Sequence, residues 1–193
     1  MLRHILGAFV LLLIAASNAG AFDGIRKGLV LGGGLGAAAN VSWKADFEFA
    51  PDAGENNAGF GTAIFAGYAW DERNMIVLEG NGARYVTDIG ILPDVAAIQG
   101  FGGASWYHYF GDMGRSPFTV VGLGVYIFQW EYTPTALNRK NDPGPGVLIG
   151  GGYEFTDHVQ VGVYIGAGRT TEPETGVEFD HGHVSVLLSA IAF

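Results

Sequence analysis

The feature that most constrains this sequence is an alternation of apolar residues with small or polar ones, repeated along most of its length. In residues 159–169, Val or Ile occupies nearly every second position, and Gln, Gly and Tyr fill the positions between them. A period of two residues is typical of a β-strand, because successive side chains point to opposite faces. The alternation marks eight segments: 29–37, 60–70, 75–86, 96–110, 119–129, 146–155, 159–169 and 181–193. The sequence therefore predicts an all-β fold with eight strands.

The connections between these segments are of two kinds. Residues 71–74, 111–116 and 156–158 are short and polar, whereas 44–57, 87–95, 131–144 and 170–180 are longer and contain prolines. Short turns that alternate with long loops are typical of an outer-membrane β-barrel with both termini in the periplasm. We therefore expect an antiparallel, up-and-down transmembrane barrel that displays four loops. An exported soluble barrel of the lipocalin type is the alternative, but the face opposite the apolar residues is mostly glycine and other small residues.

The beginning of the chain resembles an export signal. Arg3 and His4 precede an apolar stretch, 5–16, and Ala19-Gly20-Ala21 fits a small-residue cleavage site. The apolar stretch is shorter than the ~20 residues that a spanning helix needs, which argues against a retained anchor. We expect residues 1–21 to be a signal peptide and 22–193 to be one outer-membrane barrel domain.

Composition excludes several classes of function. The net charge is −9, and removal of Arg3 with the signal makes the chain more acidic, so nucleic acid is a poor partner. The chain has no cysteine, which excludes disulfides and thiolate sites. Glycine is abundant, with 32 residues against about 14 expected, and it recurs inside the apolar segments. This distribution indicates closely packed strands.

Aromatic residues cluster where the predicted strands end. Those beside the short turns are Tyr68, Trp70, 106–110 and Phe155, and those beside the long loops are Trp43 and Trp130. Such residues form the two girdles of a membrane barrel. The chain closes on Phe193, which we expect at the periplasmic end of the eighth strand with its side chain facing lipid. Ser185 and Ser189 blur the apolar pattern of that strand.

Together these segments resemble the small eight-stranded outer-membrane barrels of Gram-negative bacteria, the opacity-protein, OmpX and OmpA-domain group. The resemblance rests on 1–21, on the glycine-rich segment 27–36, on 117–124 and on Phe193. It implies a surface-exposed, non-catalytic protein of the cell envelope, acting as a membrane anchor, adhesin or surface antigen, with lipopolysaccharide around it. It also implies that the C-terminal strand, with Phe193, is read by the barrel-assembly machinery. A few related barrels are lipid-modifying enzymes.

One stretch, 180–185, contains residues that could carry chemistry. His181 and His183 project from the same face of a strand, as two metal ligands could. His183 and Ser185 also resemble the His-x-Ser of the lipid A deacylase barrels. That family's following Asn and later acid are absent, so an acid would have to come from elsewhere, such as Glu178 or Asp180. We interpret these as ordinary strand residues and predict no catalytic or metal site.

Four polar residues within the strands are candidates for the lumen: Glu79, His108, Glu154 and Arg169. Charges cannot remain isolated in a narrow lumen, so pairing with one another or with tyrosines is expected. A proton or ion path is an alternative, although a barrel of eight strands is ordinarily filled by its own side chains. Glycines on the inward face leave volume that aromatic side chains or a small apolar ligand could occupy.

The remaining signals are weak. Residues 32–37 match a dinucleotide-binding glycine pattern, but no amphipathic helix follows them. Acidic residues gather in the first long loop (Asp46, Glu48, Asp52, Glu55) and in the last (Glu172, Glu174, Glu178, Asp180). Divalent cations that bridge lipopolysaccharide could bind there, although an acidic, solvated rim is the simpler interpretation. We predict no cofactor, and the partner of the loops cannot be read from the sequence.

Overall fold

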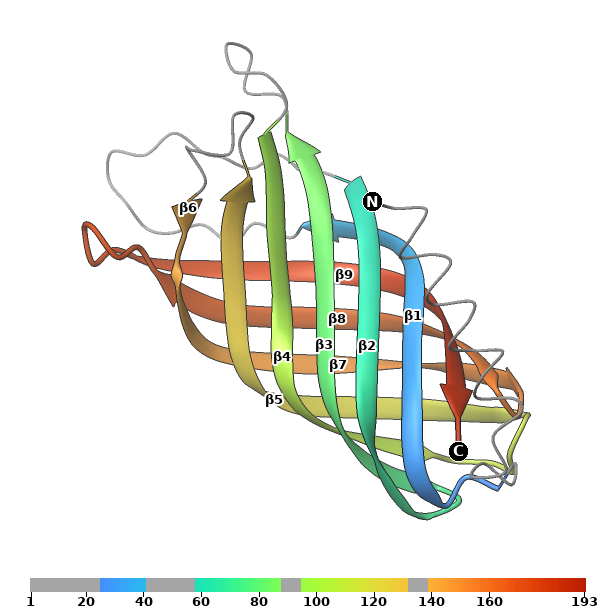
Figure 1. The fold of residues 1–193 in the computed structure, drawn as a ribbon. Coiled ribbons are helices and arrows are strands. Elements are labelled where there is room, and N and C mark those ends of the chain that lie inside the picture. Colours follow the sequence, from blue (N-terminus) through green and yellow to red (C-terminus); the bar gives the residue numbers. More distant parts are fainter. Residues whose placement is uncertain (1–24, 41–57, 88–94, 132–138) are drawn as a thin grey trace.

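The computed structural model describes residues 25–40, 58–87, 95–131 and 139–193. Eight long strands form the body of the molecule (Figure 1), and all of them pair antiparallel with their neighbours. They are β1 (Gly28–Asn40), β2 (Ala58–Asp71), β3 (Asn74–Thr87), β4 (Val95–Tyr109), β5 (Ser116–Glu131), β7 (Asp142–Thr156), β8 (Val159–Thr171) and β9 (Glu178–Ala192). A two-residue strand, β6 (Arg139–Lys140), adds to the end of β5. The expected signal peptide, 1–21, lies outside the described residues.

The sheet closes on itself. Each long strand pairs with the next one along the chain, and the first pairs with the last, from Leu31 opposite Ala192 to Asn40 opposite His183. Closure leaves no unpaired edge, so every long strand has two partners. The expectation of an all-β, eight-stranded, up-and-down barrel is confirmed.

The two ends of the barrel differ in their connections. At one end, here called the short-turn end, the connections are 72–73, 110–115 and 157–158, and β1 begins and β9 finishes there. At the other end, here called the long-loop end, β1, β3, β5 and β8 finish and β2, β4, β7 and β9 begin (Figure 1). The chain segments that join these strand ends are 41–57, 88–94, 132–141 and 172–177. The last of these is shorter than expected because β8 and β9 pair as far as Thr171 and Glu178. Of the acidic residues expected in the first loop, all four lie outside the described part.

The outer face of the barrel is an apolar belt. Its large side chains are strongly exposed, with Ile64, Leu78 and Leu123 at 71%, 73% and 70%. An outward apolar belt of this kind is the surface that outer-membrane barrels present to lipid. Among the described residues, no helix is long and apolar enough to cross a membrane.

Among the described residues, Phe60 is a large aromatic side chain exposed on the outer face near the long-loop end, at 47%, and more of them line the outer face at the short-turn end. Tyr68, Trp70, Trp106, Phe110 and Phe155 are all between 44% and 55% exposed there. At the long-loop end Trp130 instead packs beside Phe128 against an inward cluster of Ala38, Ala83, Tyr85 and Ala97. The expectation that Trp130 belongs to a second aromatic girdle is therefore wrong. Trp130 and the buried Tyr126 share the even-numbered face of β5, which points inward. Trp43 lies outside the described residues.

Candidate functional site in the barrel lumen

The lumen is packed with side chains, most of them aromatic. Inward positions on all the long strands contribute to one main cluster of buried apolar residues. Its largest members are Tyr107, Tyr109, Tyr126, Tyr164 and Phe118, each no more than 2% exposed. Neighbouring rings contact one another; the Tyr107 and Phe118 centroids are 5.9 Å apart. Aromatic side chains therefore occupy most of the cross-section, as the width of an eight-stranded barrel leads one to expect.

Inward glycines provide the space that these rings fill. A Cβ placed on Gly32 would overlap the ring of Phe65, and one on Gly168 would overlap Tyr126. At Gly162 the added Cβ would lie 2.7 Å from the Tyr164 ring. The volume beside these glycines is thus taken by the chain's own rings, which leaves no room there for a small apolar ligand.

A buried carboxylate lies in the middle of the lumen. Glu79, on β3, is 4% exposed and accepts a hydrogen bond of 3.0 Å from the Tyr107 hydroxyl. The amide of Asn81 lies 3.4 Å from the other carboxylate oxygen of Glu79. Within the described part of the chain, Glu79 makes no ion pair, so hydrogen bonds from neutral groups compensate its burial.

His183 and Ser185 lie further toward the long-loop end, and both are fully buried in the lumen. They do not contact each other through a hydrogen bond. The two ring nitrogens of His183 face the Tyr126 hydroxyl at 2.8 Å and the Asn81 carbonyl oxygen at 3.2 Å, and Ser185 donates to that same oxygen at 3.3 Å. A general base must reach the proton of its nucleophile, so this arrangement forms no Ser–His pair. Since both side chains point into the lumen, a lipid on the outer face cannot reach them.

His181 has a separate environment from His183. Its ring is stacked on Phe128, with centroids 4.2 Å apart, and its Nε2 lies 2.8 Å from the Thr170 hydroxyl. The acids considered as partners of a catalytic His, Glu178 and Asp180, are instead bound to Arg169 on the exposed rim. Within the described ranges, no group of three or more His, Asp and Glu side chains could hold a metal ion.

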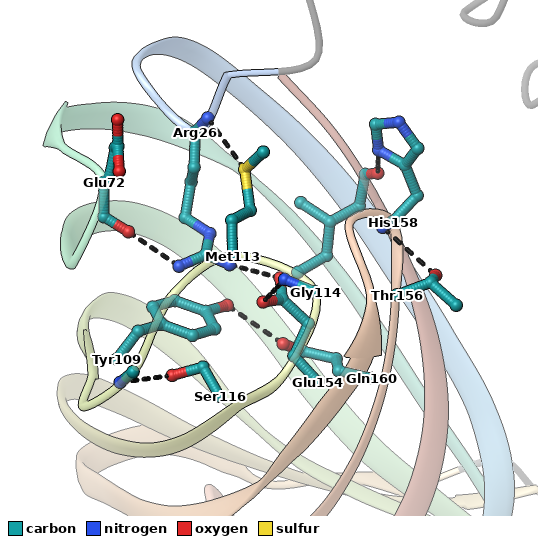
Figure 2. A network of polar contacts seen from close by, with 12 residues as sticks. Arg26, Glu72, Tyr109, Met113, Gly114, Ser116, Glu154, Thr156, His158 and Gln160 are labelled. Carbon is teal, nitrogen blue, oxygen red and sulfur yellow. Dashed lines mark hydrogen bonds and ion pairs between the residues drawn. The ribbon is translucent and has the colours of Figure 1, made fainter.

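A second polar network fills the short-turn end (Figure 2). Arg26, two residues before β1, is fully buried and forms an ion pair with the fully buried Glu154 of β7. The guanidinium also donates to the backbone carbonyl of Glu72 at 2.7 Å and lies 3.5 Å from the centre of the Tyr109 ring. The other Glu154 oxygen accepts from the backbone of Gly114 at 2.8 Å. The two terminal nitrogens of this guanidinium thus have acceptors in a buried site, whereas its Nε has no hydrogen-bond partner among the described residues.

The network continues from this ion pair into the lumen. The Tyr109 hydroxyl donates to the Gln160 side chain at 2.9 Å, and Gln160 lies 3.5 Å from the Tyr164 hydroxyl. These residues come from β4 and β8, on different sides of the barrel. Their hydrogen bonds therefore connect β4 and β8 across the lumen, on the side of the ion pair that faces the middle of the barrel.

The four residues expected in the lumen divide into two pairs. Glu79 and Glu154 point inward, as described above. His108 lies on the outer face, where its ring contacts Phe110 and its Nδ1 lies 2.8 Å from Asn74. Arg169 also lies outside the lumen, at the long-loop end, where it pairs with Glu178 and Asp180. The expectation for His108 and Arg169 is thus corrected: each occupies a position one residue out of step with the inward set of its strand.

Phe193 is the most informative correction. We expected its side chain to face lipid, but it is 1% exposed and belongs to the lumenal cluster. Its ring lies 5.2 Å from that of His158 and 5.7 Å from the Arg26 guanidinium carbon. Ser185 and Ser189 share this inward face of β9, so their polarity belongs to the lumen and does not disturb the lipid-facing pattern. The role of Phe193 in assembly stays a prediction.

Arg26 is the residue that sequence reasoning missed. It precedes the first alternating segment and was therefore left out of every predicted strand. A signal was present, since Arg26 falls on the same alternate positions as the inward Val30 and Gly32. An arginine in register with an inward face, with a glutamate available in another strand, could have indicated a lumenal ion pair.

Comparison with known proteins supports the fold and leaves the activity open. No protein-family model and no curated protein matches the sequence. Among solved structures, Neisserial surface protein A is similar with a TM-score of 0.56 at 14% identity, over 85% of this chain and 96% of that one. Ail, the attachment invasion locus protein of Yersinia pestis, solved with the heparin analogue sucrose octasulfate, has a TM-score of 0.55 at 10% identity, over 86% and 99%. The chain is thus similar to the small eight-stranded outer-membrane barrels.

Proposed function

We propose that this chain is a non-catalytic outer-membrane protein whose barrel holds four loops at the cell surface. In this proposal the short-turn end faces the periplasm and the long-loop end faces outward. The apolar outer belt and the aromatic side chains beside the short turns support a position in the membrane. Envelope structure, adhesion and a role as a surface antigen all fit a protein of this design.

The observation that carries the proposal is the filled lumen. Rings, the Glu79 hydrogen bonds and the Arg26–Glu154 ion pair occupy it from the middle to the short-turn end. A barrel with a filled interior and an outer face suited to lipid can contact other soluble molecules only at its two ends. The three longest connections, 41–57, 88–94 and 132–141, all join strands at one end, so contact with other molecules is assigned to that end.

The charge of that end restricts the class of partner. The sequence of the first long loop contains four acidic residues and one lysine, Lys44, and the region of the last loop contains Glu172, Glu174 and Glu178. Arg84, Arg139 and Arg169 form ion pairs with Glu131, Glu172 and Glu178, so each pair is neutral and the excess of acids in the first loop and at Glu174 remains. A polyanion such as the heparin analogue found with Ail would be repelled, whereas cationic or neutral partners would not.

A binding measurement with purified protein tests this assignment. Protein in lipid nanodiscs would be passed over immobilised poly-L-lysine and over immobilised heparin at physiological salt. We expect binding to poly-L-lysine alone, and a loss of about tenfold or more when Asp46, Glu48, Asp52 and Glu55 become amides. The control carries Asp112→Asn and Asp157→Asn at the short-turn end and should bind as the wild type does. Tight binding to heparin, or equal loss in the control, would overturn the charge assignment.

The absence of catalysis has its own test, aimed at the only serine and histidine pair that resembled an enzyme. Lipid A would be compared by mass spectrometry between cells that express the wild type, cells that express Ser185→Ala and cells without the protein. Because Ser185 is buried and bonded to Asn81, we expect three identical profiles. A lipid species that depends on Ser185 would contradict the proposal.

A further inference from the structure

Arg26 has an unusual position for a charged side chain. It lies in the short segment 25–27, outside the hydrogen-bonded ladder of the strands, yet it is fully buried at the mouth of the barrel. Its neighbours in the sequence, Ile25 and Lys27, are exposed. Segment 25–27 therefore inserts the Arg26 side chain into the mouth of the barrel (Figure 2), while Ile25 and Lys27 remain exposed.

The groups around the guanidinium form a site that matches its chemistry. Glu154 provides the opposite charge, the Glu72 carbonyl accepts a second N–H, and the Tyr109 ring covers the planar face at 3.5 Å. The Phe193 ring lies on the same cation at 5.7 Å. A planar cation with several donors in fixed directions fits such a combination of acceptors and rings better than an ammonium does.

These groups come from distant parts of the chain. Glu154 is at the end of β7, Glu72 is in the turn between β2 and β3, Tyr109 closes β4, and Phe193 follows β9. The Arg26 backbone N–H also contacts the Met113 sulfur, in the turn between β4 and β5, at 3.3 Å. The site exists only when all of these strands are in place, that is, after the barrel has closed.

We propose that segment 25–27 is a latch, that is, a segment whose Arg26 side chain can enter and leave a binding site while the barrel stays folded. The site that it enters, here called the receptor, binds a guanidinium group and forms when the barrel closes. Arg26 enters this site after the barrel has closed. It then connects the start of β1 with the β2–β3 turn, with the β4–β5 turn and with Phe193, the last residue of the chain. The latch can also open without unfolding of the barrel, because it contributes no strand pairing. When it opens, the exposed receptor accepts a small guanidinium compound in place of the arginine.

Proteolysis detects the latch directly, since trypsin cuts after arginine and lysine. In the wild type, cleavage after Arg26 and Lys27 should be slow, and mass spectrometry of the digested barrel reports it. In Glu154→Gln the latch loses its ion pair, and we expect cleavage there to be about tenfold faster or more, because breaking a buried pair is costly. Glu131→Gln removes the partner of the exposed Arg84 and serves as the control, with no change expected. Equal resistance of the wild type and Glu154→Gln would overturn the latch.

The receptor is tested with added ligand. Ethylguanidinium at low millimolar concentration should compete with Arg26 in the wild type and accelerate the cleavage after Lys27, whereas ethylammonium should have a much smaller effect. In Arg26→Ala, which leaves the site open, ethylguanidinium should slow thermal unfolding, as followed by heat-dependent gel mobility. An equal response to both cations, or a response of the same size in the Arg169→Ala control, would overturn the guanidinium site. The wild-type arm requires no variant to fold.

Discussion

Single glycines have two different roles in this barrel. On the inward face, Gly162 leaves the space that the Tyr164 ring fills, so the absence of a side chain is required for packing. On the outward face, Gly102 has open space where a Cβ would lie, with no atom within 4 Å. The number of glycines in the sequence does not distinguish these two roles. They are distinguished by whether the glycine lies on the inward or the outward face of its strand.

Substitution by alanine should separate the two positions. We expect Gly162→Ala to lower the free energy of unfolding by about 1–3 kcal/mol, because the methyl group would press on a ring in a packed lumen. Gly102→Ala should change it by less than about 1 kcal/mol, or raise it slightly. Urea unfolding in lipid vesicles, followed by tryptophan fluorescence, measures both. If Gly162→Ala is as stable as Gly102→Ala, the lumen is less tightly packed than described.

At the scale of an element, β9 shows what a sequence pattern leaves undecided. Both of its faces are apolar, with Leu187 and Ile191 inward and Val186 and Leu188 outward. Hydrophobicity alone could not choose the lumenal face, and we chose wrongly for Phe193. The eight strands and the two kinds of connection were predictable, because alternation and turn residues are local signals. The partners of Arg26 and Trp130 were not, because they come from strands far away in the sequence, although the register of Arg26 with Val30 indicated its inward direction.

The outward face of a strand can be tested through β3. Leu78 points away from the lumen and is 73% exposed within the apolar belt, whereas Arg84 is a natural cation on the same face near the long-loop end. We expect Leu78→Arg to lower the stability in bilayers by about 2–4 kcal/mol, because a cation would be placed in hydrocarbon. Leu78→Ala, as the control for lost contact area, should cost less. Folding yield into vesicles and urea unfolding report the difference, and equal stability of both variants would argue against a lipid-facing belt at Leu78.

At the scale of the whole molecule, a closed β-sheet surrounds a lumen that is filled with packed side chains. The ion pair at the short-turn end, the rings in the middle and the His183–Asn81–Glu79 contacts follow one another along the lumen. A structure of this kind separates an outer face suited to lipid from one end with long, acidic loops. The packed interior contributes to the stability of the barrel. We propose that the loops make the contacts with other molecules.

A filled lumen predicts low ion permeability. Purified protein in planar bilayers should show no stable openings of the size expected for a general-diffusion pore, because such pores need a wider barrel with more strands. The measurement is single-channel current at a constant voltage, with a known porin as the positive control. Reproducible openings of porin size would show that the described packing is not the conducting state.

The orientation of the barrel in the cell is the central claim, and the cysteine-free chain allows it to be measured directly. Glu174→Cys places a unique thiol in the exposed β8–β9 loop at the long-loop end, and Asp157→Cys places one in the exposed β7–β8 turn at the short-turn end. Intact cells would be treated with a maleimide that cannot cross the outer membrane. We predict labelling of Glu174→Cys in intact cells, and of Asp157→Cys only after the outer membrane has been permeabilised. Labelling of Asp157→Cys in intact cells, with Glu174→Cys protected, would contradict the account.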